Sequence, residues 1–174
     1  MPKDISAPLI LVGPGTGIAP FRGFWHHRRH LIEHLVSHNP GPVWLFFGCR
    51  YKGMELYKEE KEGAVAAGVL HKARLALSRE EGAHKKYVQA LLEDEGAELT
   101  RLLTEEHGHF YVCGDCKMAD DVEQKLTEII QKHRGITEED ATEFVTVLRH
   151  ENRYHEDIFG ITLRTAEVHS ASRK

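Results

Sequence analysis

The stretch from Leu9 to Arg22, LILVGPGTGIAPFR, constrains the fold of this chain more than any other. Four apolar residues lead straight into Gly13, Gly15 and Gly17, and an amphipathic run follows Pro20. This pattern predicts a buried strand, a tight turn and the start of a helix. Glycine permits positive φ and the close approach of an anion, and the first helical turn presents unpaired N–H groups. The stretch is therefore either a structural junction or a site for a phosphate group.

As a nucleotide-binding motif, this glycine turn is incomplete. Ile18 stands where the dinucleotide fingerprint G-x-G-x-x-G has its third glycine, and the lysine of a Walker loop is missing. Other parts of the chain must decide between the two alternatives.

The composition limits the classes of partner. The 174 residues are 41% hydrophobic and 29% charged, which is typical of a soluble domain with its own core. The net charge is −4 with histidine neutral, so we expect no global basic surface for nucleic acid or anionic lipid. We see no apolar run of the roughly 20 residues that span a membrane, and no signal peptide. Three cysteines, an odd number, indicate reduced thiols and a cytoplasmic protein.

Apolar runs alternate with helical patterns along the chain. Strands are predicted at 9–12, 43–47, 70–77, 109–113 and 154–163. Helices are predicted at 21–38, at 54–67, at 88–106 with a break near Gly96, from the turn at Gly114 and Asp115 to His133, and from Thr137 onward. The alternation predicts an α/β fold with a doubly wound, mostly parallel five-stranded sheet and helices on both faces. We expect a single domain over 1–174, with 160–174 forming a C-terminal strand and tail.

Ligands of such a sheet bind at the carboxyl ends of its strands, and several polar residues fall there. Arg50 follows the second strand, where a NAD-preferring site usually has an acid, and Ser78 and Arg79 follow the third. Lys85, Lys86 and Tyr87 open the next helix and form a basic cluster that contains an aromatic ring. Cations and hydroxyls suit a phosphomonoester, and a tyrosine ring can stack on a purine. Each of these is also an ordinary surface residue by itself, but their convergence at one edge favours a nucleotide site.

Two patterns indicate other chemistry. Cys113 and Cys116 form C-x-x-C where a strand turns into a helix, as in a dithiol redox site whose helix amides lower a thiol pKa. Zinc is disfavoured because a second cysteine pair is missing, and the third alternative is a single cysteine beside a ligand.

His26, His30 and His34 recur at helical spacing, but the chain lacks H-E-x-x-H, so we interpret them as a solvated face. No metal site is predicted.

Six blocks, in this order, carry a resemblance to a known family. They read GPGTGIAPFR, FGCR, LSRE, KKYVQ, YVCGD and RYHEDIFG. Together they resemble the NADPH-binding subdomain of the ferredoxin reductase-like module in diflavin reductases, from about Leu9 to Val168. The run RYHEDIFGITLRTAEV resembles the nitric oxide synthases in particular, since other members, such as the cytochrome reductase, usually end near position 159.

The resemblance implies roles for individual residues. The pyrophosphate would contact Gly15, Thr16 and Gly17, with Arg50 nearby. The 2′-phosphate and the adenosine ribose would be held by Ser78, Arg79, Lys86, Tyr87, Gln89 and Arg164. The nicotinamide would lie beside Cys113 and Asp157, with Gly114 and Asp115 in the cofactor site, and Phe159 would cover the flavin ring as a gate.

The resemblance also implies a larger enzyme. NADPH would pass hydride to FAD, shared with an FAD-binding domain in the same protein, while FMN, haem and tetrahydrobiopterin would act only in the full-length synthase, which forms nitric oxide from arginine. We find no counterpart of the FAD barrel, the FMN domain, the calmodulin-binding helix or the haem domain. We therefore expect a fragment that binds NADP(H) and depends on the missing regions for calmodulin binding and the homodimer. Cys116 departs from the family pattern, so the thiol alternative stays open beside a second one, a cytochrome reductase-like enzyme.

Overall fold

The fold is a five-stranded parallel sheet between two layers of helices. The computed structural model describes residues 1–34, 39–82 and 84–159. The strands lie in the order β3-β2-β1-β4-β5, and every neighbouring pair is parallel. Their bounds are β1 Leu9–Val12, β2 Val43–Cys49, β3 Lys72–Leu77, β4 His109–Asp115 and β5 Tyr154–Phe159. The predicted doubly wound α/β fold is confirmed, and the sheet is parallel throughout.

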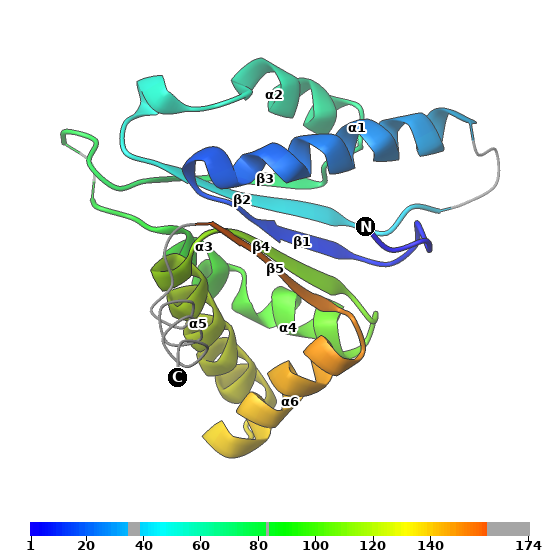
Figure 1. Ribbon diagram of the computed structural model, residues 1–174, viewed down its shortest axis with the longest axis vertical. Helices are drawn as coiled ribbons and strands as arrows, with labels where there is room; N and C mark the ends of the chain where they lie inside the picture. Colours follow the sequence, from blue (N-terminus) through cyan, green and yellow to red (C-terminus); the bar gives the residue numbers. More distant parts are fainter. Residues whose placement is uncertain (35–38, 83, 160–174) are drawn as a thin grey trace, which may run out of the picture.

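Helices cover both faces of the sheet (Figure 1). One face carries α1 (Ala19–His34) and α2 (Lys58–Ala66), and the short 3₁₀ helices η1 (Gly15–Ile18) and η2 (Lys52–Met54) follow β1 and β2. The other face carries α3 (Val88–Asp94), α4 (Gly96–Thr104), α5 (Cys116–Arg134) and α6 (Glu138–His150). Within the described residues, we find no helix both long and apolar enough to cross a membrane.

Alternating side chains of the strands build two separate cores. Ile10 and Val12 of β1 join the core beneath α3, α5 and α6, whereas Leu9 and Leu11 join the core beneath α1 and α2. All four residues of β1 are at most 1% exposed. A strand buried on both faces reads as a continuous apolar run, which explains why the sequence located β1 so well.

Helix ends follow local sequence signals, with one correction. Thr137 accepts a hydrogen bond from the Asp140 N–H (3.1 Å), which confirms the predicted cap of α6. The predicted break within 88–106 occurs at Glu95. The predicted helix over 54–67 is wrong at its start, because Tyr57 has the left-handed φ of 52° and α2 begins only at Lys58.

Other predicted bounds differ by a few residues. The third strand begins at Lys72, because the N–H groups of Val69 and Leu70 bond to the Ala64 carbonyl at the end of α2 and not to β2. The last residues of two predicted elements, 35–38 of the first helix and 160–163 of the last strand, lie outside the described residues.

The strand order creates a switch point beside β1. Successive connections lead from β1 outward to β2 and β3, and the chain then crosses to β4 and β5 on the other side. The turn after β1 therefore lies next to the carboxyl end of β4. In doubly wound folds, ligands bind in the crevice at this point.

Three stacked rings lie along β4 and β5. The rings of Tyr111 and His155 are 4.4 Å apart, and those of His109 and His155 are 6.2 Å apart and nearly parallel. Nδ1 of His109 and Nε2 of His155 are buried, and neither has a hydrogen-bond partner among the described residues. Burial lowers the pKa of both imidazoles, so the folded protein favours their neutral forms.

These two histidines should make stability depend on pH. Because their pKa values in the folded protein lie below the unfolded value near 6.5, the unfolded chain binds protons more readily as the pH falls. We expect this stability to be fully present above about pH 6.5 and to be lost progressively below it. Thermal unfolding between about pH 8 and about pH 5 measures the loss, and a double variant, His109→Gln with His155→Gln, should show a flatter profile. An unchanged slope in that variant would exclude these two histidines as the cause.

Candidate functional site

The glycine turn after β1 has one open position and one closed position. Gly15 has φ +56°, and a Cβ built there would meet nothing within 4 Å, so its backbone is accessible to an anion. Thr16 beside it is exposed. A Cβ on Gly17, in contrast, would lie 2.0 Å from the Cys113 carbonyl oxygen. Gly17 is thus required by the close packing of the turn on β4, whatever it contributes to a ligand.

Ile18 occupies the place of the missing third glycine. Its side chain is fully buried in the core beneath α1 and α2. The departure from the dinucleotide fingerprint therefore fills a core position and leaves the open backbone at Gly15 unchanged.

The ends of β2 and β3 bring two arginines together. The Ser78 N–H donates to the Cys49 carbonyl (3.0 Å), and the Arg79 N–H donates to the Arg50 carbonyl (2.9 Å). These bonds extend the parallel ladder beyond both strands, so Arg50 and Arg79 are neighbours across it. Both side chains are exposed. The predicted meeting of Arg50, Ser78 and Arg79 at one edge is what the structure shows.

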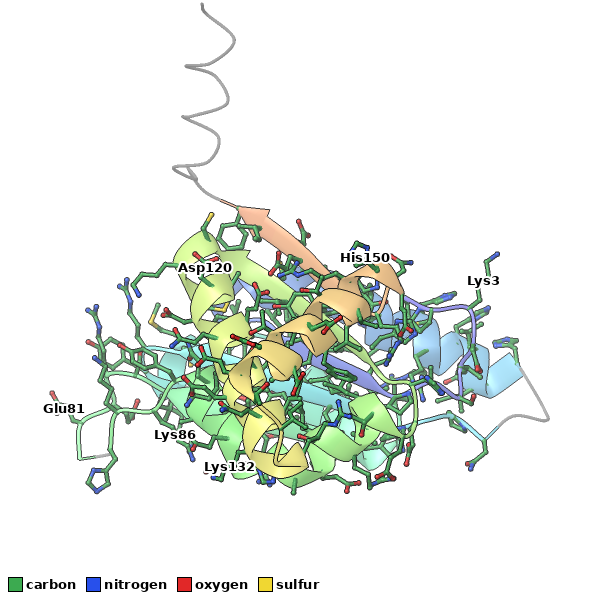
Figure 2. All side chains as sticks on the ribbon, turned by 90° about the horizontal axis from the view of Figure 1, so that it is seen from below. Lys3, Glu81, Lys86, Asp120, Lys132 and His150 are labelled. Carbon is green, nitrogen blue, oxygen red and sulfur yellow. The ribbon has the colours of Figure 1, made fainter. Side chains whose placement is uncertain are left out.

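The segment before α3 returns to this edge, and its two lysines, Lys85 and Lys86, have different partners. The Lys86 N–H donates to the Leu77 carbonyl (2.9 Å), which joins the segment to the end of β3. The Lys86 ammonium forms an ion pair with Asp94, and Figure 2 labels this lysine on the same side of the molecule as Glu81. The Lys85 ammonium lies 4.9 Å from the centre of the Tyr87 ring, which is 52% exposed.

Lys85 belongs to the basic cluster that the sequence singled out, but the family resemblance implied a phosphate-binding role for Lys86 and not for Lys85. Tyr87 is extended (φ −111°, ψ 167°), and in extended chain, alternate side chains share a side. That period of two places Lys85 with Tyr87 and turns Lys86 elsewhere. Residue type alone does not distinguish the two neighbouring lysines. The two-residue alternation of an extended segment could have distinguished them in the sequence.

The three exposed cations at this edge suit a doubly charged anion. Among the described residues, Arg50, Arg79 and Lys85 have no carboxylate within ion-pair distance. The nearby Glu80 carboxylate accepts from the Lys52 N–H (2.7 Å). The Gln89 side chain adds a buried Oε1 with no hydrogen-bond partner in the described structure. Guanidinium and ammonium groups bind phosphate, so the residues present fit a phosphorylated nucleotide.

The ends of β4 and β5 carry the residues expected beside a nicotinamide. Cys113 pairs with Asp157 in the parallel register, and Asp115 pairs with Phe159. Burial and the Asp157 charge raise the pKa of Cys113 to about 11, so its thiol is protonated at neutral pH. Phe159 is 48% exposed. Arg164, expected near the 2′-phosphate, lies outside the described residues.

Cys113 lacks the low thiol pKa that the dithiol alternative requires. Burial and the Asp157 charge raise its pKa. All three cysteines are free. Cys116 is the first residue of α5, and the Asp115 carboxylate caps this helix by accepting from the Met118 N–H (3.0 Å). Asp115 thus has a structural task in addition to its predicted place in the cofactor site.

Comparisons with known proteins agree with this geometry. The family model described as oxidoreductase NAD-binding domain matches residues 11–124. The chain is 69% identical to a nitric oxide synthase of Bombyx mori over its whole length, 48% identical to that of Drosophila melanogaster over 99% of the chain, and 47% identical to nitric oxide synthase 3 of Sus scrofa over 99%. It spans 15%, 13% and 14% of the length of these relatives.

Two glycine substitutions should have opposite effects on stability. Gly17→Ala places a methyl group against the Cys113 carbonyl, and we expect a loss of about 1 to 3 kcal/mol in the free energy of unfolding. Gly23→Ala in α1 meets nothing within 4 Å and should raise that free energy by about 0.5 to 1 kcal/mol. Urea denaturation measures both. A Gly17→Ala protein as stable as the parent would contradict the close packing of the turn on β4.

Proposed function

The chain belongs to the family of oxidoreductase NAD-binding domains, and we propose that it is the NADPH-binding part of a nitric oxide synthase reductase. In the full enzyme this part would deliver hydride from NADPH to FAD. The observation that carries the proposal is the meeting of Arg50 and Arg79 across the extended β2–β3 ladder, beside Lys85 and Tyr87. Identity to nitric oxide synthases along the whole chain supports it.

The 2′-phosphate of NADPH would bind at the ends of β2 and β3. Arg79, Lys85 and the Ser78 hydroxyl would hold it, and the exposed Tyr87 ring would pack against the adenine. Gln89 is proposed to contribute its unpartnered Oε1 to the adenosine ribose. The pyrophosphate would approach the open backbone of Gly15 and Thr16, near Arg50.

The nicotinamide would lie at the ends of β4 and β5. When bound, NADPH supplies the hydride and FAD accepts it, so the redox chemistry is that of the cofactors. The protonated Cys113 thiol and its cross-strand partner Asp157 would position the ring and stabilise charge that develops on it. Phe159 is exposed at the end of an edge strand, which supports a role as the aromatic gate over the flavin.

The remaining steps require parts of the protein beyond this chain. We propose that an FAD-binding domain in the same polypeptide completes the site, and that FMN and haem receive the electrons in turn. Tetrahydrobiopterin, calmodulin and the homodimer contact would belong to those other regions. The free cysteines support a cytoplasmic location.

The cationic edge should distinguish NADP⁺ from NAD⁺. We expect Arg79→Ala to weaken NADP⁺ binding by about 1 to 3 kcal/mol and to leave NAD⁺ binding unchanged, because only NADP⁺ carries the 2′-phosphate. Isothermal titration calorimetry at fixed salt measures both affinities. Lys132→Ala removes the same charge at the other end of α5, about 24 Å from Cys116 along the helix axis, and serves as the control. If the parent protein binds both nucleotides equally, the proposed site is wrong.

Neighbouring lysines should differ in the same assay. We expect Lys85→Ala to weaken NADP⁺ binding severalfold more than Lys86→Ala, because the Lys86 ammonium is engaged by Asp94 and the Lys85 ammonium lies over Tyr87. The two variants lose the same charge, so a long-range effect cancels in the comparison. A larger loss with Lys86→Ala would restore the assignment made from the sequence.

A further inference from the structure

The proposed 2′-phosphate site is built from two segments that are joined by packing of α3 and β3 in one core and by a backbone hydrogen bond. Ser78 and Arg79 follow β3, whereas Lys85, Tyr87 and Gln89 belong to the start of α3. Between them, Glu81, Gly82 and His84 are exposed, and the backbone hydrogen bond from the Lys86 N–H to the Leu77 carbonyl connects the two segments. The spacing of the phosphate-binding groups therefore depends on how firmly α3 is held against β3.

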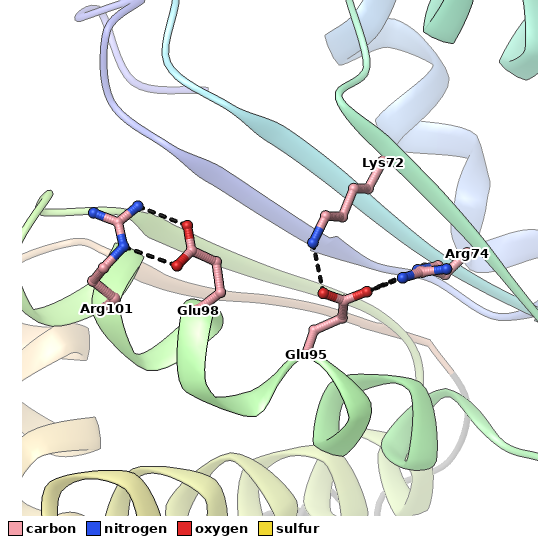
Figure 3. Close-up of polar contacts among 5 residues, drawn as sticks. All are labelled: Lys72, Arg74, Glu95, Glu98 and Arg101. Carbon is pink, nitrogen blue, oxygen red and sulfur yellow. Dashed lines mark hydrogen bonds and ion pairs between the residues drawn. The ribbon is translucent and has the colours of Figure 1, made fainter.

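A carboxylate at the far end of α3 provides such a link (Figure 3). Glu95, directly after α3, accepts from Lys72 Nζ (2.6 Å) and from Arg74 Nε (2.9 Å), and Arg74 Nη2 also contacts it. Both cations lie on β3. The Lys72 ammonium is additionally held 3.8 Å from the centre of the Trp44 ring on β2. Glu95 thus joins the α3–α4 junction to β3, and Lys72 extends this link to Trp44 on β2.

The surroundings of Glu95 make this link stronger than an ordinary surface ion pair. Its side chain is only 11% exposed. Burial opposes its ionisation, but hydrogen bonds from Lys72 and Arg74 outweigh that effect and lower its pKa. A partly buried carboxylate with two cationic partners is screened less by water and salt than an exposed pair.

We propose that Glu95 is a positioning residue for nucleotide recognition: its contacts with Lys72 and Arg74 fix α3 against β3 and thereby set the spacing of Lys85 and Tyr87 relative to Arg79. This inference rests on the proposed function of that edge. Glu95 itself lies at the opposite end of α3 from the nucleotide and touches no part of the proposed site. Its effect should therefore be on NADP⁺, whose 2′-phosphate contacts both segments, more than on NAD⁺.

The chain contains a matched control within one helical turn. Glu98 pairs with Arg101 inside α4 (2.7 Å), and both side chains are exposed (Figure 3). Glu98 is hydrogen-bonded to Arg101, whereas Lys72 of β3 acts on it through its charge, with no hydrogen bond among the described residues. Glu98→Gln removes the same charge as Glu95→Gln from nearly the same place. Any difference between the two variants therefore reports the link to β3 and not the change in net charge.

The test measures NADP⁺ and NAD⁺ affinities of the parent, Glu95→Gln and Glu98→Gln by calorimetry. We expect Glu95→Gln to lower the ratio of NADP⁺ to NAD⁺ affinity about fivefold and Glu98→Gln to leave it unchanged. Loss of stability alone would not move this ratio. If Glu95→Gln fails to fold, Arg74→Gln weakens the same link from the strand and should lower the ratio in the same direction.

Two outcomes would overturn the inference in distinguishable ways. If the parent prefers NADP⁺ and both Glu95→Gln and Arg74→Gln keep its ratio, Glu95 has no positioning role and the proposed function stands. If the parent does not prefer NADP⁺, the proposed function fails first and the inference fails with it.

Discussion

Burial of β1 on both faces and both edges is the constraint on which the rest of the structure depends. Its four residues pair with β2 on one side and β4 on the other, and they contribute to both cores. The N–H and C=O groups of a strand in this position can form hydrogen bonds only with the neighbouring parallel strands. The turn that follows must therefore emerge at the carboxyl edge, between the ends of β2 and β4.

The close approach of the turn to β4 links the two halves of the proposed site. Gly17 lies against the Cys113 carbonyl, and Cys113 is in register with Asp157. On the side of the turn, Gly17 is close to the open backbone at Gly15. On the side of β4, Cys113 is one of the residues beside which a nicotinamide would lie. A dinucleotide that spans the switch point would meet both, which is how doubly wound folds generally bind such ligands.

Electrostatics divide the edge of the sheet into two regions with different chemistry. At the ends of β2 and β3, the exposed Arg50, Arg79 and Lys85 favour a highly charged group. At the end of β4, burial keeps the Cys113 thiol neutral, with its pKa raised to about 11. The first region suits recognition of a phosphate, and the second suits a ring held in place without a competing nucleophile.

The sequence by itself determined the approximate strand positions, the Thr137 cap of α6 and the polar residues at the strand ends, because apolar periodicity and cap chemistry act within a few residues. It also indicated that Arg50 and Arg79 meet, since parallel strands end at one edge. Only the tertiary structure paired the Lys86 ammonium with Asp94, raised the pKa of Cys113 and brought Glu95 onto Lys72 and Arg74. Those features depend on which side chain faces which neighbour and on how much water is excluded. For Cys113 and Glu95, both are set by segments more than 20 residues apart that meet only when the sheet is assembled.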